Sequence, residues 1–288
     1  MEINIKAKDY LEELRLMCNQ WNQETDLYPW IYMLLQMGEV AHVSIRDIHS
    51  CLKNRSPLFY GLVGAPDFVI LDKNVILQEY SDKNKEYDIE KHKEIKNITC
   101  LRGCVEIKKL YVELCIKEFE DKLKQDKNTD SSNEKIEFNK NEYQIIGHLL
   151  WYGKVLYTNG LQWEFLEWKN REEYLRVGNL EKTKKTINIL KGINKENLLN
   201  KCNITNVTYN DKSNDESKNK LNDETNNLSK NNSIDELDMV KLNLNVSITK
   251  ICDLGNHDDI RNNKIPGNFK QEWSKLIKFL KENDFWYQ

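Results

Sequence analysis

Two short apolar segments of this chain carry charged residues at positions that a buried strand tolerates poorly. Residues 64–70 (Gly-Ala-Pro-Asp-Phe-Val-Ile) and 103–109 (Gly-Cys-Val-Glu-Ile-Lys-Lys) both have the β-branched and apolar content of buried strands. Side chains of a strand alternate between the two faces of its sheet, so Glu106 and Lys108 share one face while their apolar neighbours take the other. Burying a carboxylate and an ammonium group is costly unless they pair with each other or with a metal. The two segments therefore predict a sheet that carries a charged site.

Asp67 adds a second carboxylate to this site. It follows Pro66, which cannot donate to a strand ladder, and so it lies at the entry of the first strand. Two carboxylates from adjacent strands, with a lysine two residues past the second, form a hard-oxygen site for Mg²⁺ or Mn²⁺. The lysine can then orient or help to deprotonate an attacking water, whose pKa the metal lowers. The alternative for Glu106 and Lys108 is a surface ion pair on an edge strand.

A helix, a strand and a polar turn follow downstream. Residues 142–152 have a helical pattern, and residues 155–163 contain a strand and the triplet Thr-Asn-Gly. Together with Pro-Asp and Glu-x-Lys, this order resembles the PD-(D/E)XK nuclease superfamily, in particular the N-terminal nuclease domain of type I restriction enzyme motor subunits and related stand-alone proteins. The resemblance covers about residues 20–170. Its matching downstream positions are Gln144, Thr158, Asn159, Gly160 and Trp163.

The resemblance implies an α/β protein of restriction-endonuclease-like fold, in which helices flank a mixed central sheet. It also implies a Mg²⁺- or Mn²⁺-dependent nuclease that hydrolyses DNA phosphodiester bonds in a nucleic-acid-processing or defence setting. In this chain Asp67 and Glu106 would hold the metal, Lys108 would handle the water, and Gln144 would support the site.

The sequence leaves two further assignments open. In the resembled family, the helix before the strands carries a glutamate that completes the metal site or holds a water. Glu24 is our choice for it and Glu39 is the alternative, and either can instead be a solvated helix-end charge. Gln144 and His148 are four residues apart and share a helical face. They either face the site or form the polar rim of a helix whose other face is core.

The composition limits the partners and the compartment. A net charge of −3 argues against a generally basic nucleic-acid-binding surface, although a local cleft can still be positive. Seven cysteines, with no signal peptide ahead of them, predict reduced thiols in the cytoplasm. No apolar run approaches the ~20 residues of a membrane span, so we expect no membrane partner. The chain has no Gly-x-x-x-x-Gly-Lys-Ser/Thr motif, so a nuclease of this kind would act alone, with partner chains or as a homo-oligomer.

We expect one nuclease-like domain over residues 1–288. Residues 210–235 have almost no apolar content and are predicted to be a disordered excursion. A strand and a helix are predicted within 240–288, the helix beginning after Asn268. The other predicted elements are helices within 7–37 and over 110–123, a strand over 43–48 and a hairpin excursion within 75–97. Residues 187–190 and 203–209 are candidate strands that could pair with the predicted C-terminal strand.

The function predicted from the sequence is thus DNA hydrolysis, and its rival comes from a different class. The rival is a catalytically silent protein of nuclease fold that acts as a nucleic-acid-binding or protein-interaction scaffold. The intact set of Asp67, Glu106 and Lys108 favours the enzyme. Mn²⁺ binding discriminates between the two, since an active site of this kind binds the ion and a scaffold need not.

Overall fold

The structure is a computed structural model, and the part of the chain that it describes has several gaps. Glu39, the hairpin excursion within 75–97 and all but the first two residues of the predicted excursion at 210–235 lie outside the described residues. The described residues are 5–20, 23–37, 43–48, 61–72, 101–114, 121–122, 138–175, 180–194, 197–211, 242–282 and 286.

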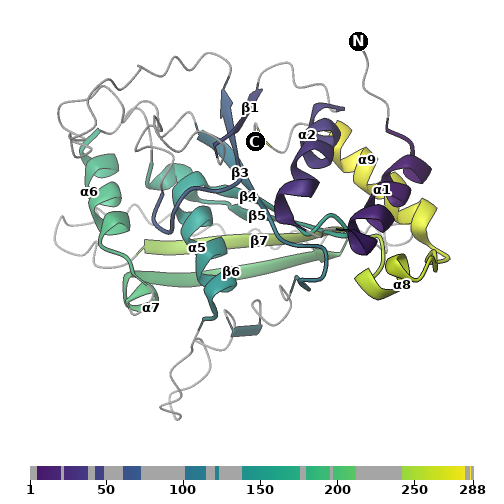
Figure 1. The fold of residues 1–288 in the computed structure, drawn as a ribbon. Coiled ribbons are helices and arrows are strands. Elements are labelled where there is room, and N and C mark those ends of the chain that lie inside the picture. Colours follow the sequence, from purple (N-terminus) through teal and green to yellow (C-terminus); the bar gives the residue numbers. More distant parts are fainter. Residues whose placement is uncertain are drawn as a thin grey trace, which may run out of the picture.

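A seven-stranded mixed sheet forms the centre of the described part of the chain (Figure 1). The strand order is β1-β2-β3-β4-β5-β7-β6, with β3 parallel to β4 and β6 parallel to β7, and every other neighbouring pair antiparallel. The strands are β1 (Val43–Asp47), β2 (Phe68–Asp72), β3 (Leu101–Ile107), β4 (Lys154–Thr158), β5 (Gln162–Trp168), β6 (Cys202–Asp211) and β7 (Leu242–Asp253).

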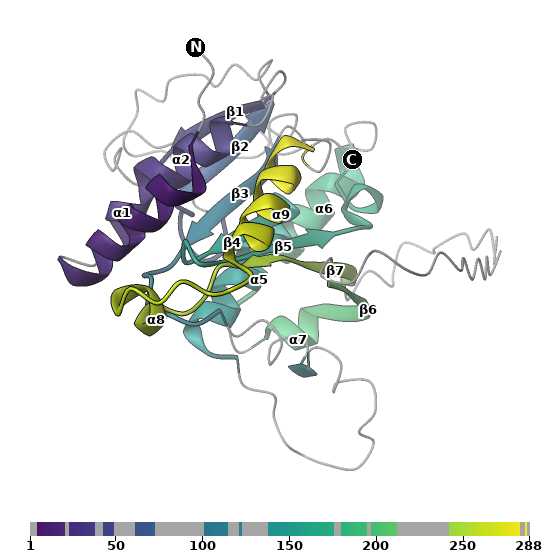
Figure 2. The ribbon, with the colours of Figure 1, turned by 90° about the vertical axis from the view of Figure 1, so that its right-hand side faces the viewer.

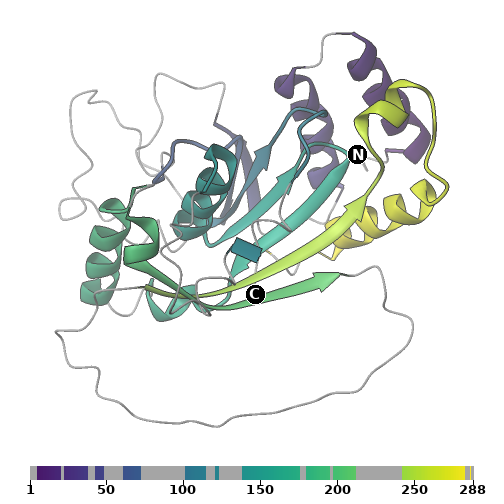
Figure 3. The same ribbon diagram turned by 90° about the horizontal axis from the view of Figure 1, so that it is seen from below.

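Helices cover both faces of this sheet, which confirms the predicted α/β class (Figures 1 and 2). One face carries α1 (Ala7–Asn19), α2 (Tyr28–Gln36), α8 (His257–Arg261) and α9 (Phe269–Lys281). The other face carries α5 (Lys140–Tyr152), α6 (Leu180–Lys191) and α7 (Leu198–Lys201). Figure 3 views the same arrangement from below, with β6 at one edge of the sheet. No helix of the described part is long and apolar enough to cross a membrane.

Each face of the sheet has its own core, because strand side chains alternate between the faces. Val105 and Ile107 belong to the core under α1, α2 and α9, whereas Cys104 belongs to the core under α5 and α6. Glu106 and Lys108 therefore take the face on which α5 lies, as the alternation predicts.

Helix α5 begins and ends at residues that fix its position over this second core. Asn139 caps it by accepting from the Glu142 backbone N–H, and the Glu142 side chain accepts from the Asn139 N–H in return. Gly153 follows its last turn with a φ of 81°, a left-handed conformation that favours glycine. Within the helix, a Cβ on Gly147 would lie only 2.3 Å from a Val63 methyl carbon. A glycine is needed there because the helix lies directly against the segment that leads to Asp67.

Several predicted elements agree with the structure, and three differ from it. Residues 203–209 pair with β7 as expected. Residues 187–190 do not; they continue α6, where Thr183, Thr186, Ile187 and Leu190 form a buried face at helical spacing. Residues 110–114 form a turn and coil instead of the start of a helix. Asn268 is the N-cap of α9, as predicted, but its side chain makes no capping hydrogen bond.

We predict that Trp273→Ala will destabilise the protein strongly. Trp273 is buried in α9 against Tyr10, with 5.0 Å between the ring centroids. Removing the ring should lower the free energy of unfolding by about 3 kcal/mol or more, measured by urea denaturation. The matched control is Lys270→Ala, an exposed position of the same helix, which should change it by less than about 0.5 kcal/mol. Equal stability of the two variants would contradict the packing of α9 on the core.

Candidate active site

Strand pairing brings Asp67 beside the end of β3. Phe68, the first residue of β2, is paired with Val105, so Asp67 lies level with Glu106. The Ile107 backbone N–H donates to Asp67 Oδ2 at 2.6 Å, which ties this carboxylate to the β3 strand. Asp67 is 5% exposed and Glu106 is 3% exposed. Two carboxylates are thus buried next to each other at one end of the sheet.

Burial and the neighbouring charge raise the pKa of Asp67 to about 8. Burial is the larger cause and the charge of Glu106 is the second, while hydrogen bonds from the Tyr28 hydroxyl and from Ile107 N–H lower the pKa in part. The Tyr28 hydroxyl donates to Asp67 Oδ1 from helix α2. The charge of Glu24 also raises the pKa of Asp67. In the absence of a cation, the site therefore favours a protonated Asp67.

Lys108 links Glu106 to helix α5. Its Nζ donates to Glu106 Oε1 at 2.6 Å and to Gln144 Oε1 at 3.0 Å. The ammonium is itself buried, with 9% of the residue exposed, so the ion pair with Glu106 is poorly screened by water. The structure thus brings Asp67, Glu106, Lys108 and Gln144 together. The alternative prediction, a surface ion pair between Glu106 and Lys108, is wrong because both side chains are buried.

His148 approaches the other oxygen of Glu106. Its Nε2 lies 3.2 Å from Glu106 Oε2, but the two atoms do not have hydrogen-bond geometry. Among the described residues, Glu106 Oε2 and both ring nitrogens of His148 have no hydrogen-bond partner. Burial acts to raise the pKa of Glu106, but the contacts with His148 and Lys108 outweigh it and hold that pKa below its usual value. Glu106 is therefore the ionised member of the carboxylate pair.

The Thr-Asn-Gly triplet forms the turn between β4 and β5. Asn159 Oδ1 accepts from the backbone N–H groups of Leu161 and Gln162, at 2.9 and 2.7 Å. Its Nδ2 donates to the Val112 carbonyl at 2.7 Å. The side chain thus ties this turn to the loop that follows Lys108, in a structural rather than a chemical role.

Gly160 and its contacts hold the same turn against the N-terminal helices. Its φ is 85°, and a Cβ there would lie 2.9 Å from a Leu27 methyl carbon. Its carbonyl accepts from the Tyr10 hydroxyl at 2.8 Å and from Trp163 Nε1 at 3.3 Å. Trp163 is fully buried, so it packs the core and does not face a ligand.

Glu24 lies in the short helix η1 (Glu24–Leu27), just before α2. Burial is the main cause of the raised pKa of Asp67 and of Tyr28, and the charge of Glu24 adds to it, so Glu24 acts electrostatically on Asp67. Glu39, the alternative for the helix glutamate, lies outside the described residues. Among the described residues, no group of three or more His, Cys, Asp or Glu side chains has the geometry of a metal site.

The residues present nevertheless have the donor chemistry that a hard divalent cation requires. Asp67 and Glu106 supply neighbouring carboxylates, the preferred ligands of Mg²⁺ and Mn²⁺. Glu106 Oε2 is buried without a hydrogen bond from the described part of the chain, and the pKa of Asp67 is raised partly by Glu106. A cation between the two carboxylates would relieve their repulsion.

Sequence reasoning missed Tyr28 as part of the site and left His148 open. Tyr28 is buried in α2 together with apolar residues, and no local pattern links it to Asp67, which lies 39 residues away. For His148, the four-residue spacing from Gln144 was the available signal.

Comparisons of the chain with protein-family models, with curated proteins and with solved structures find no match. The chemistry of the site therefore rests on its own geometry.

We predict a specific pH dependence of stability in EDTA. The folded-state pKa of Asp67 is raised to about 8, above the unfolded value of about 3.9, so folding is favoured while this carboxyl stays protonated. Its contribution is fully present below pH ~3.9 and is lost as the pH rises towards about 8. Asp67→Asn should therefore flatten the fall in the free energy of unfolding across that window, measured by urea denaturation at each pH.

Glu164→Gln is the matched control for this measurement. Burial raises the pKa of Glu164 to about 8 as well, with the same sign, so each variant should remove only its own part of the slope. If Asp67→Asn left the slope of the wild type unchanged, Asp67 would not be the protonated group that we describe.

Proposed function

We propose that this protein is a metal-dependent nuclease that hydrolyses phosphodiester bonds of DNA. The observation that carries the proposal is the gathering of two buried carboxylates with a buried lysine that bonds to both Glu106 and Gln144. Paired carboxylates beside a lysine are the groups needed to hold a divalent cation and to orient a water next to it. The seven-stranded sheet with helices on both faces is compatible with the restriction-endonuclease-like fold, which we include in the proposal.

Each residue has a distinct role in this proposal. Asp67 and Glu106 would hold Mg²⁺ or Mn²⁺, which when bound lowers the pKa of a water and offsets charge on the phosphodiester. Lys108 orients the attacking water through its ammonium group, and Gln144 fixes the direction of that group. Tyr28 and the Ile107 N–H hold the Asp67 carboxylate in position, and with it the ligand geometry.

One observation favours the rival function, a catalytically silent scaffold. Both oxygens of Asp67 accept hydrogen bonds from Tyr28 and Ile107, and Glu106 pairs with Lys108. Most of the polar atoms are thus satisfied within the chain. A cluster of this kind can stabilise a fold without binding a metal. The rival predicts neither Mn²⁺ binding nor cleavage.

Two variants should separate metal binding from catalysis. Asp67→Asn should lose Mn²⁺ binding and nuclease activity together, because it removes a ligand charge. Lys108→Ala should still bind Mn²⁺, while cleavage falls about 100-fold or more because the water is no longer oriented. The measurements are calorimetric Mn²⁺ titration and cleavage of single- and double-stranded DNA and RNA.

Lys278→Ala is the control, since Lys278 is an exposed lysine of α9 and should behave as the wild type in both assays. A wild type that neither binds Mn²⁺ nor cuts any of the four substrates would favour the scaffold. Cleavage by Lys108→Ala at the wild-type rate would remove the lysine from the mechanism.

A further inference from the structure

We propose that a cavity beside the candidate active site binds one unstacked nucleobase of the nucleic acid, with preference for a base that carries an exocyclic amino group. This inference rests on the proposed nuclease function, because it assigns a base of the strand that is cut. It gives the protein a preference for single-stranded or distorted nucleic acid, since a base within a duplex is stacked and cannot enter a cavity.

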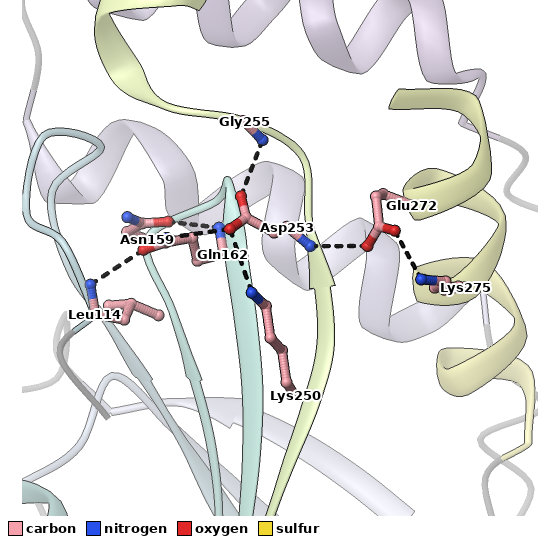
Figure 4. Close-up of polar contacts among 8 residues, drawn as sticks. All are labelled: Leu114, Asn159, Gln162, Lys250, Asp253, Gly255, Glu272 and Lys275. Atoms are coloured by element: carbon pink, nitrogen blue, oxygen red, sulfur yellow. Dashed lines mark hydrogen bonds and ion pairs between the residues drawn. The ribbon is translucent and has the colours of Figure 1, made fainter. Parts of the chain in front are cut away.

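The cavity has a volume of about 410 Å³ and lies where three segments of the chain meet. The segments are the loop after β3, the turn between β4 and β5, and the loop after β7 together with the first residues of α8. The size falls in the range of small-ligand sites. Figure 4 shows Asn159 and Gln162 beside Asp253 and Gly255 at this end of the sheet. The lining residues that the proposal uses are Tyr111, Glu113, Asn159, Gln162, His257 and Asp258.

Tyr111 provides an aromatic surface at the cavity. The residue is 56% exposed, although the preceding Leu110 is buried in the core. Lys109 Nζ lies 5.9 Å from the centre of the Tyr111 ring, and the His257 ring lies edge-on with 6.2 Å between the centroids. Aromatic side chains held in this way bind bases by stacking, irrespective of the base. The nearby ammonium of Lys109 is available to the phosphate of the same nucleotide.

The polar groups of the cavity favour a base over a phosphate. Among the described residues that line it there is no lysine or arginine, whereas Glu113 and Asp258 contribute carboxylates, and Asp258 Oδ1 lies 3.2 Å from His257 Nδ1. Carboxylates accept hydrogen bonds from an amino group such as that of cytosine and repel a phosphate. The Gln162 amide adds a donor: Leu114 N–H uses its oxygen at 3.1 Å, but its Nε2 is 3.5 Å from Asp253 Oδ2, at the limit of a hydrogen bond.

The cavity lies at the same end of the sheet as the residues proposed to cut the strand. The Lys108 backbone N–H donates to the Thr158 carbonyl at 2.8 Å, and Asn159, the next residue, lines the cavity. Lys109 lies between Lys108 and the aromatic ring of Tyr111 in the chain. A strand whose phosphodiester reaches Lys108 can therefore continue along this end of the sheet towards the cavity.

Anisotropy measurements with fluorescein-labelled single-stranded oligo(dC) and oligo(dT), in EDTA so that no cleavage occurs, test the inference. The wild type should bind oligo(dC) about tenfold more tightly than oligo(dT), because thymine has no amino group. Tyr111→Ala should weaken oligo(dC) binding about tenfold or more, and Tyr111→Phe should retain it. The double variant Glu113→Ala/Asp258→Ala should lose the preference for oligo(dC). Tyr32→Ala, which removes another partly exposed tyrosine, should bind as the wild type.

Unchanged binding by Tyr111→Ala, equal affinity of the wild type for the two oligonucleotides, or no binding at all would each overturn the inference. Cleavage in Mn²⁺ separates it from the proposed function. A wild type that cuts, together with a Tyr111→Ala variant that binds normally, removes the base site and keeps the nuclease. A wild type that binds through Tyr111 with the expected preference but does not cut keeps the base site and removes the nuclease.

Discussion

The pairing of β2 with β3 imposes the strongest constraint on this structure, because it buries two carboxylates side by side. Asp67 and Glu106 cannot both be charged there without compensation, and burial, followed by the charge of Glu106, raises the pKa of Asp67. Each carboxylate receives donors from a different side of the sheet. Tyr28 reaches Asp67 from α2, and Lys108, held by Gln144 of α5, reaches Glu106. The helices on both faces are thus coupled to the site through hydrogen bonds to these two groups.

Most of the strands could be predicted from the sequence, because short β-branched and apolar runs between glycine, proline and polar residues mark them. The segments at 68–72 and 101–107 are of this kind. The prediction of a strand at residues 187–190 was wrong, because the same apolar residues also match a helical period. Their burial against the sheet favours the helix. The strand order was not predictable, since it depends on pairing between residues far apart in the chain, which local patterns do not encode.

The sequence allowed a better prediction of which residues form the site than of the side chains that bond to them. Charged residues within apolar strands are costly, so Asp67, Glu106 and Lys108 were conspicuous in the sequence. Helical spacing then indicated one face of α5 for Gln144. Tyr28 was not predictable, because an aromatic residue on an apolar helix face has no local sign of a polar contact. The catalytic roles of these residues stay predictions.

The position of a bound cation tests the central claim most directly. Crystals of the protein soaked with Mn²⁺ and measured at a wavelength where manganese scatters anomalously would reveal it. We predict an anomalous peak between the carboxylates of Asp67 and Glu106, with metal–oxygen distances of roughly 2.0–2.3 Å. We also expect Glu106 to bind the ion through Oε2, the oxygen that Lys108 does not pair with. A soaked crystal with no peak between these two carboxylates would contradict the proposed metal site.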